Sequence, residues 1–239
     1  KIRSLIFKLD PETAHNLAIQ TLKLNKFNKR KKERNKKLSS EIFGKQVDNP
    51  IGLAAGFDKN AEVYNSIFNL GFGFVEVGTI TPLKQYGNPK PRVFRLEEDE
   101  ALINRLGFNN SGAENISQRI KQNPPKGFFG INIGPNKESK DKINDYLICL
   151  KKFYNLADYI TINISSPNTE NLRELHDHEK LDNLLESINN EKKKLSTNVP
   201  IVVKISPDID ESEIDRTSEL FINKNISAVI ISNTTDKFR

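Results

Sequence analysis

The strongest constraint on the fold is a repeated order of elements, in which a short apolar run precedes a longer amphipathic run. The short runs are rich in Val, Ile and Phe, and the longer runs carry apolar residues at helical spacing. The predicted strands span Ile51–Ala55, Phe74–Gly78, Phe128–Ile133, Tyr159–Ile164, Ile201–Ile205 and Ala228–Ser232. The predicted helices span Glu62–Asn69, Ala113–Gln122, Lys142–Asn155, His178–Leu195 and Ser212–Asn223. This alternation predicts a parallel α/β domain.

Polar residues stand at or just beyond the end of each predicted strand. They are Asp58, Lys59, Thr79, Asn132, Asn163, Lys204 and Asn233. In a β/α barrel the carboxyl ends of the strands share one rim, and active sites lie on that rim. The pattern therefore predicts one shared site.

Two parallel architectures compete for this pattern. An open doubly wound sheet would carry a glycine-rich phosphate turn after its first strand, and Gly52–Gly56, which reads GLAAG, is not GxGxxG. We therefore expect a (β/α)8 barrel. Six strands do not close eight, so we also expect that about two C-terminal β/α units are missing and that the functional protein is longer.

The N-terminal segment has its own pattern. Ile2–Leu24 shows apolar residues at helical spacing, interrupted at Asp10-Pro11-Glu12. Asp10 can cap a second helix that begins at Pro11, which gives two short amphipathic helices. We expect residues 1–42 to form this helix pair with a basic linker, and residues 43–239 to form the barrel domain. The pair would cover an apolar surface, either of the domain or of a lipid.

The net charge of +6 is concentrated in Lys23–Lys37, which reads KLNKFNKRKKERNKK. Such a run fits a solvated face, an anionic lipid contact or a nucleic-acid patch. No nucleic-acid fold signature accompanies it, so we expect no nucleic-acid partner. No stretch approaches the roughly 20 apolar residues of a spanning helix, so membrane association would be peripheral. Cys149 is the only cysteine and is expected to be a packed thiol.

Several residues could carry chemistry. Asn163–Asn168 offers two hydroxyls and two amides at a strand end, although an Asx or Ser turn explains the same residues. Lys59 and Lys204 would stabilise negative charge on a carbonyl-rich ligand or a reduced flavin. Asn104–Asn110 lies in a long connection, which usually has a function. The three histidines show no metal-ligand spacing, so no metal site is expected.

Eight ordered motifs then carry a family resemblance. They read GLAAGFDKN at Gly52–Asn60, EVGTITP at Glu76–Pro82, GNPKPRVFRL at Gly87–Leu96, INRLGFNN at Ile103–Asn110, GINIGPNK at Gly130–Lys137, INISSPNT at Ile162–Thr169, VKISPD at Val203–Asp208 and SNTT at Ser232–Thr235. With them the chain resembles the quinone-dependent, or class 2, dihydroorotate dehydrogenases. Ser in SSPN and the N-terminal helices favour class 2 over the soluble class 1, whose base is a cysteine in another loop.

The resemblance implies oxidation of dihydroorotate to orotate in pyrimidine biosynthesis, with FMN as hydride acceptor and a membrane quinone as final electron acceptor. Ser166 would be the catalytic base that takes the C5 proton, while hydride leaves C6 for flavin N5. The implied substrate contacts are Lys59, Asn104, Arg105, Leu106, Gly107, Phe108, Asn163, Asn168, Asn233 and Thr234. The implied FMN contacts are Ala55, Gly56, Phe57, Asp58, Lys59, Thr79, Asn132, Asn163, Lys204 and Ser232. His15 and Arg95 would meet quinone.

The implied location is a peripheral membrane surface, namely the cytoplasmic face of a bacterial inner membrane or the mitochondrial inner membrane of a eukaryote. Pro135 departs from the family pattern, as does Glu170-Asn171 after SSPNT. The expected missing C-terminal units are where the family keeps its FMN-phosphate loops. Two alternatives stay open: another FMN barrel acting on a related pyrimidine or an enone, and a basic membrane-surface or nucleic-acid-binding module.

Overall fold

A computed structural model describes residues 6–24, 37–166, 172 and 177–235. Its main sheet has six parallel strands in the order β10-β9-β8-β7-β4-β3. Their bounds are β3 (Gly52–Leu53), β4 (Phe74–Ile80), β7 (Phe128–Ile133), β8 (Tyr159–Asn163), β9 (Ile201–Lys204) and β10 (Ala228–Ile230). Neighbours in the sheet are successive parallel strands of the chain, so the order never reverses. A doubly wound sheet would show such a reversal. The sheet is part of a β/α barrel, with β3 and β10 at its edges.

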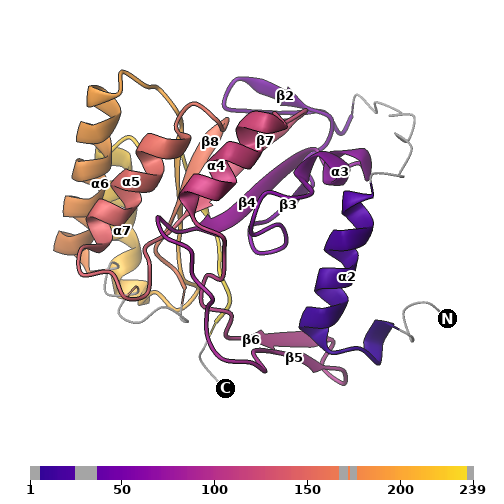
Figure 1. The fold of residues 1–239 in the computed structure, drawn as a ribbon. Coiled ribbons are helices and arrows are strands. Elements are labelled where there is room, and N and C mark those ends of the chain that lie inside the picture. Colours follow the sequence, from indigo (N-terminus) through magenta and orange to yellow (C-terminus); the bar gives the residue numbers. More distant parts are fainter. Residues whose placement is uncertain (1–5, 25–36, 167–171, 173–176, 236–239) are drawn as a thin grey trace.

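The helices of the barrel repeat cover one face of this sheet (Figure 1). They are α3 (Tyr64–Asn69), α4 (Ala113–Gln122), α5 (Lys142–Phe153), α6 (His178–Lys194) and α7 (Ile214–Asn223), the last preceded by the short 3₁₀ helix η2 (Glu211–Glu213). Asp141 and Asp177 begin α5 and α6 by accepting the amides of Asn144 and Lys180. All six predicted strands and five predicted helices are present, and β7 and α4 have the predicted bounds.

The two faces of the sheet differ because side chains alternate along each strand. Val75, Ile131 and Ile160 point outward and are fully buried against the helices. Phe128, Tyr159 and Val202 point inward and form a second apolar cluster. The outer face therefore supplies the main core, and the inner face encloses the space where the strands converge.

A hairpin that the sequence analysis does not predict closes the start of the inner face. It consists of β1 (Ser40–Ile42) and β2 (Lys45–Val47), which pair antiparallel. Phe43 at its tip lies with its ring centroid 6.4 Å from that of Phe128 and 6.0 Å from that of Tyr159. These aromatic contacts fill the end of the half-barrel at which the strands begin.

A second unpredicted hairpin interrupts the long connection after β4. Its strands are β5 (Val93–Leu96) and β6 (Ala101–Asn104). Each has four residues and no fully buried side chain, so neither shows the apolar alternation that marks a longer strand. The hairpin lies beside the first turn of α2 (Pro11–Lys23) (Figure 1).

Helix α2 begins as predicted, because the Asp10 carboxylate accepts the Thr13 amide at 2.9 Å and Pro11 is the first helical residue. Its Ile19 and Leu22 join the main core, and the Leu22 carbonyl accepts the Ser66 hydroxyl at 2.8 Å. Of the helix predicted before Asp10, only its last residues are described, and most of the basic run lies outside the described residues. No helix in the described part of the chain is long and apolar enough to span a membrane.

Candidate active site

The inner face becomes polar toward the carboxyl ends of the strands, beginning with Glu76 on β4. Its side chain points inward because it stands two residues after Phe74. Its carboxylate accepts hydrogen bonds from Asn132 Nδ2 at 2.9 Å and Thr161 Oγ1 at 2.8 Å. Glu76 is only 3% exposed. A carboxylate buried this far needs such donors, so Glu76 fixes the side chains of two neighbouring strands.

The next layer joins β4, β7 and β8 through Thr79, Asn132 and Asn163. Thr79 Oγ1 donates to Asn132 Oδ1 at 2.7 Å, and Asn163 Nδ2 lies 3.0 Å from Thr79 Oγ1 and 3.2 Å from Asn132 Oδ1. All three residues are buried. Their amides therefore have fixed orientations and form a rigid polar wall.

The network continues into the segment after β8. Ser165 Oγ donates to Asn163 Oδ1 at 2.7 Å and accepts from Asn233 Nδ2 at 3.0 Å. The Asn163 carbonyl accepts the hydroxyl of Tyr146 on α5 at 2.7 Å. Ser166 follows directly and is 3% exposed. The end of β8 is thus tied to the residues after β10 and to the helix layer.

Two lysines bring positive charge to this wall. Lys204 on β9 pairs in register with Asn163, and Lys59 follows β3. Burial lowers the pKa of both amines, opposed by the charge of Glu76 at Lys204 and chiefly by that of Glu12 at Lys59. Within the described residues neither ammonium group makes a hydrogen bond. Two half-buried cations without acceptors favour an anionic or carbonyl-rich ligand.

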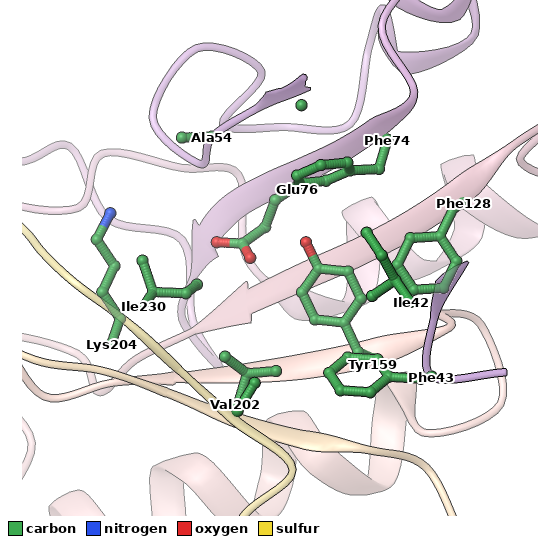
Figure 2. A pocket seen from close by; sticks show the side chains of 12 residues that line it. Ile42, Phe43, Ala54, Phe74, Glu76, Phe128, Tyr159, Val202, Lys204 and Ile230 are labelled. Atoms are coloured by element: carbon green, nitrogen blue, oxygen red, sulfur yellow. The ribbon is translucent and has the colours of Figure 1, made fainter. Parts of the chain in front are cut away.

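A cavity of about 360 Å³ lies on the inner face below this layer. Glu76 and Lys204 line it together with Phe74, Tyr159 and Ile230. Figure 2 shows the Glu76 carboxylate and the Tyr159 hydroxyl pointing toward one another, with the Lys204 side chain on the other side of Glu76. Burial and the adjacent Glu76 charge raise the pKa of Tyr159, so its hydroxyl stays protonated.

The loop after β3 is shaped to admit a flat group and to hold Lys59. Gly56 has φ of +110°, and nothing lies within 4 Å of where a Cβ would stand. The Gly56 amide donates to Gly78 O at 2.8 Å, and the Gly78 amide donates to Asp58 O at 3.1 Å. The Asp58 carboxylate accepts the amides of Glu62 and Val63 at 2.7 and 2.8 Å. Asp58 therefore orders its own loop, and burial raises its pKa.

The connection that includes Asn104–Asn110 reaches the same rim. Gln85 Nε2 donates to Gly107 O at 2.9 Å, and the backbones of Gln85 and Asn110 bond to each other at 2.9 and 3.0 Å. A Cβ on Gly134 would lie 2.8 Å from Thr79 Cγ2 and 3.0 Å from the Phe108 ring. Phe108 thus lies beside the ends of β4 and β7.

The first turns of α2 also meet the rim. The His15 ring meets the Phe57 ring edge-on at a centroid distance of 5.0 Å. Burial lowers the pKa of His15, and the charge of Lys59 acts in the same direction. The described residues contain no group of three or more His, Cys, Asp or Glu side chains that could hold a metal ion. The assembled groups are cations, amides and hydroxyls, which suit an organic ligand rich in carbonyls.

Comparisons with known proteins agree with this chemistry. The family model described as dihydroorotate dehydrogenase matches residues 37–239. The chain belongs to the dihydroorotate dehydrogenase family. The curated relative from Bartonella tribocorum, named dihydroorotate dehydrogenase (quinone), is 50% identical over 237 residues, covering 98% of this chain and 66% of that protein. The one of the same name from Buchnera aphidicola is 47% identical over 243 residues, covering 98% and 72%.

Solved structures of dihydroorotate dehydrogenases share the fold of nearly all of this chain. DHODH from Eimeria tenella in complex with ferulenol has a TM-score of 0.90 and 35% identity, covering 96% of this chain and 68% of that one. The ligand-free form has a TM-score of 0.90 and 34% identity. The chain spans about two thirds of the length of the first curated relatives, 66% and 65%.

The structure brings most of the expected site residues of this dihydroorotate dehydrogenase homologue onto one rim. Thr79, Asn132 and Asn163 are joined directly by hydrogen bonds. Asn233 joins them through the Ser165 hydroxyl. Ser232 Oγ donates to Asn233 O at 3.0 Å, and the Thr234 amide donates to Asn233 Oδ1 at 2.8 Å. Asn168 lies outside the described residues.

Three further residues expected at ligands make side-chain contacts with other parts of the chain in this structure. The guanidinium of Arg105 donates to Pro91 O at 2.9 and 3.2 Å, and that of Arg95 donates to Leu9 O at 2.7 Å and Phe7 O at 3.2 Å. The Phe57 ring packs on His15. The guanidinium of Arg95 thus holds the turn before α2, and that of Arg105 holds the hairpin.

Five further residues shape the rim without a role expected from the sequence, namely Glu76, Thr161, Gln85, Glu12 and Arg92. Glu76 could have been found, because it is the single charge in the strand FVEVGTI and shares a face with Phe74. Gln85 and Arg92 lie in an irregular connection, where no periodicity indicates which side chains turn inward. Their partners become apparent only from the tertiary contacts.

Proposed function

We propose that this protein oxidises dihydroorotate to orotate, with FMN as hydride acceptor and a quinone as the final electron acceptor. The observation that carries the proposal is the pair of half-buried ammonium groups near the strand ends, Lys59 and Lys204, neither of which makes a hydrogen bond within the described residues. The family membership supports the same reaction.

The residues on the rim fit FMN. Open space beside Gly56 would admit a flat ring, and the positive charge of Lys204 would stabilise a flavin that becomes anionic on reduction. Thr79, Asn132 and Asn163 offer hydrogen-bonding groups of fixed orientation, with Ala55 and Ser232 alongside. Because the side chains of Phe57 and Asp58 are engaged elsewhere, these two would contribute through the backbone. FMN, when bound, supplies the hydride-accepting chemistry.

The substrate is an anion with several ring carbonyls. We propose that Lys59 neutralises its carboxylate and that Asn163, Asn168 and Asn233 hydrogen-bond its ring, with Thr234 alongside. The loop Asn104–Phe108 would form the opposite wall and exclude water. Orientation by several amides fixes which ring carbon faces the base and which faces the hydride acceptor.

Ser166 is proposed as the base that removes the C5 proton. The hydroxyl of its neighbour Ser165 is already shared between Asn163 and Asn233, so Ser165 has a structural role. In a closed site a serine can accept this proton if its own hydroxyl proton leaves along a relay and a nearby cation stabilises the developing charge.

The quinone is proposed to approach along α2, where His15 and Arg95 lie. Leu17 and Leu24 on this helix are 53% and 65% exposed, and they form an apolar surface suited to a lipid boundary. The protein is therefore proposed to bind peripherally to a membrane, on the cytoplasmic side in a bacterium.

The proposal is tested by the flavin spectrum of the purified protein. The full-length protein should be yellow, and anaerobic dihydroorotate should bleach it. Ser166→Ala should keep the flavin but lose bleaching by at least about 100-fold, the usual contribution of a general base. Ser187→Ala, on the surface of α6, is the matched control and should behave like the parent. A folded, colourless protein that ignores dihydroorotate would refute the proposal.

The quinone step needs a separate measurement. His15→Ala and Arg95→Ala should slow reoxidation of the reduced protein by a quinone more than they slow its reduction by dihydroorotate. Equal effects on the two half-reactions would refute the assignment of these residues to the quinone side.

A further inference from the structure

An ion pair links α2 to a part of the chain 80 residues away. Arg92 Nε donates to Glu12 Oε2 at 3.0 Å, and a terminal nitrogen of Arg92 donates to Glu12 Oε1 at 2.5 Å. The two side chains are only 7% and 13% exposed. A two-pronged pair sheltered from water has far more defined geometry than a surface ion pair.

The other terminal nitrogen of Arg92 holds the rim. It donates to Tyr86 O at 2.7 Å and to Asn88 O at 2.9 Å. Asn88 in turn donates its amide to Leu106 O at 3.1 Å and its side-chain nitrogen to Arg105 O at 2.9 Å. The Arg105 amide donates to Arg92 O at 2.8 Å, which closes the loop of contacts. One guanidinium therefore connects α2 to the loop expected to bind substrate.

The backbone packing in this region leaves little freedom. Gly87 has φ of +79°, and a Cβ there would overlap Leu106 O and lie 2.8 Å from the Arg92 guanidinium. The backbone of residues 86–88 thus packs directly against that of residues 105–107. A displacement of Arg92 must move both.

We propose that Glu12 is a positioning residue that, through Arg92, couples the seating of helix α2 to the conformation of the loop at residues 104–108. The inference rests on the proposed function only in treating that loop as the substrate wall. The coupling itself is a property of the folded chain. It would make binding on the α2 side and substrate binding at the loop favour one another, because both stabilise the same arrangement.

Helix α2 has a second tether that provides a control. Lys23 stands at the other end of the helix, and its Nζ lies 2.7 Å from Glu62 Oε1. Lys23→Gln removes the pair with Glu62, and Glu12→Gln removes the pair with Arg92 together with a longer one to the exposed Lys90 at 3.7 Å. Only Glu12 reaches the rim through Arg92. A general loosening of α2 would affect the rim in both variants.

The test is hydrogen exchange of the Asn88 and Arg105 amides in the full protein. Glu12→Gln should speed exchange at both by about tenfold or more, the factor that corresponds to loss of a charge-assisted hydrogen bond. The amides of β7 should keep their parental rates, and Lys23→Gln should leave Asn88 and Arg105 unchanged. If Glu12→Gln does not fold, Glu12→Asp keeps the charge at shorter reach and should give a smaller acceleration at the same amides.

Unchanged exchange in the folded Glu12 variant would overturn the proposal. Equal acceleration by Lys23→Gln would also overturn it, because the effect would then belong to helix docking in general. A second arm measures orotate binding and turnover. Glu12→Gln should weaken orotate binding and raise KM more than it lowers kcat, and Glu12→Asp should recover part of the loss. If the parent protein does not bind orotate, the proposed function fails, while the exchange rates still decide the coupling.

Discussion

Replacing Glu76 by glutamine should destabilise the protein moderately, and replacing it by leucine should destabilise it severely. In the parent, the carboxylate accepts Asn132 Nδ2 at 2.9 Å and Thr161 Oγ1 at 2.8 Å. The Thr161 hydroxyl can rotate and accept a hydrogen bond instead. Asn132 cannot turn over, because its Oδ1 accepts from Thr79 and from Asn163. The glutamine oxygen should therefore face Asn132, and its nitrogen should face Thr161.

The expected magnitudes follow from this geometry. Glutamine keeps both contacts but makes them neutral, and the difference between charged and neutral hydrogen bonds is about 1 kcal/mol each, or about 2 kcal/mol in total. Leucine leaves two buried donors unsatisfied at about 1–3 kcal/mol each, and it also removes the two charged bonds. A loss of about 4 kcal/mol or more is a large part of a typical stability of about 5–15 kcal/mol.

Urea unfolding at neutral pH measures both variants, with an unchanged m-value as the sign that the folded state is intact. Glu76→Gln should also lower the pKa of Lys204 further, because the Glu76 charge opposes the effect of burial there. Lys204 should then react with acetic anhydride at lower pH than in the parent. The reasoning would be refuted by equal losses for glutamine and leucine, or by a loss below about 0.5 kcal/mol for both, a change typical of ordinary surface positions.

Three further predictions concern other parts of the molecule. Burial lowers the pKa of His15 in the folded state, so its contribution to stability should be present above pH of about 6.5 and be lost as the pH falls below that value. Urea unfolding from pH 5 to 8 should therefore show a free energy of unfolding that decreases toward low pH, and His15→Asn should reduce this decrease. Gly87→Ala should cost about 2 kcal/mol or more, whereas Gly44→Ala, also at positive φ but with open space around it, should cost about 1 kcal/mol, both measured by thermal unfolding. Burial raises the pKa of the Cys149 thiol, so the folded protein should not react with a thiol reagent at pH 8, and reaction at the rate of the denatured chain would contradict this.

The fold could be predicted from the sequence where a local pattern and the tertiary environment impose the same requirement. A strand such as Phe128–Ile133 is covered on both faces, so it is apolar between polar loops except at Asn132, near its carboxyl end. Helix Ala113–Gln122 buries one stripe against the sheet and exposes the other, which gives the regular spacing that predicts it. The hairpins at Ser40–Val47 and Val93–Asn104 lack such patterns, because short strands with little burial leave the choice of residues nearly free.

The site could be predicted only in part for a related reason. Strand ends are fixed points of the barrel. A shared rim can therefore be predicted for residues placed there, such as Asn132 and Lys204, even when the loop conformations are unknown. The direction of a side chain in a long connection depends on contacts between distant segments. For Arg105 and Arg95 the expected ligand contacts stay predictions, and both guanidinium groups also bind backbone carbonyls of neighbouring segments, which the sequence does not indicate. Arginine presents donors in a fixed fork, and a fold can use it to hold loops as readily as to hold substrates.

The segment after β8 shows how the structure adds to a motif. The sequence presents two adjacent hydroxyls, and polarity alone does not distinguish a turn from a catalytic group. The Ser165 hydroxyl bonds both Asn163 and Asn233, so removing it would break this hydrogen-bonded link between the end of β8 and the residues after β10. Ser165→Ala should therefore lower stability, whereas Ser166→Ala should change reduction by dihydroorotate with little effect on unfolding. An unchanged stability of Ser165→Ala would refute this assignment of a structural role to Ser165 and a catalytic role to Ser166. The rigid wall that orients the proposed base would then not depend on the hydrogen bonds of Ser165.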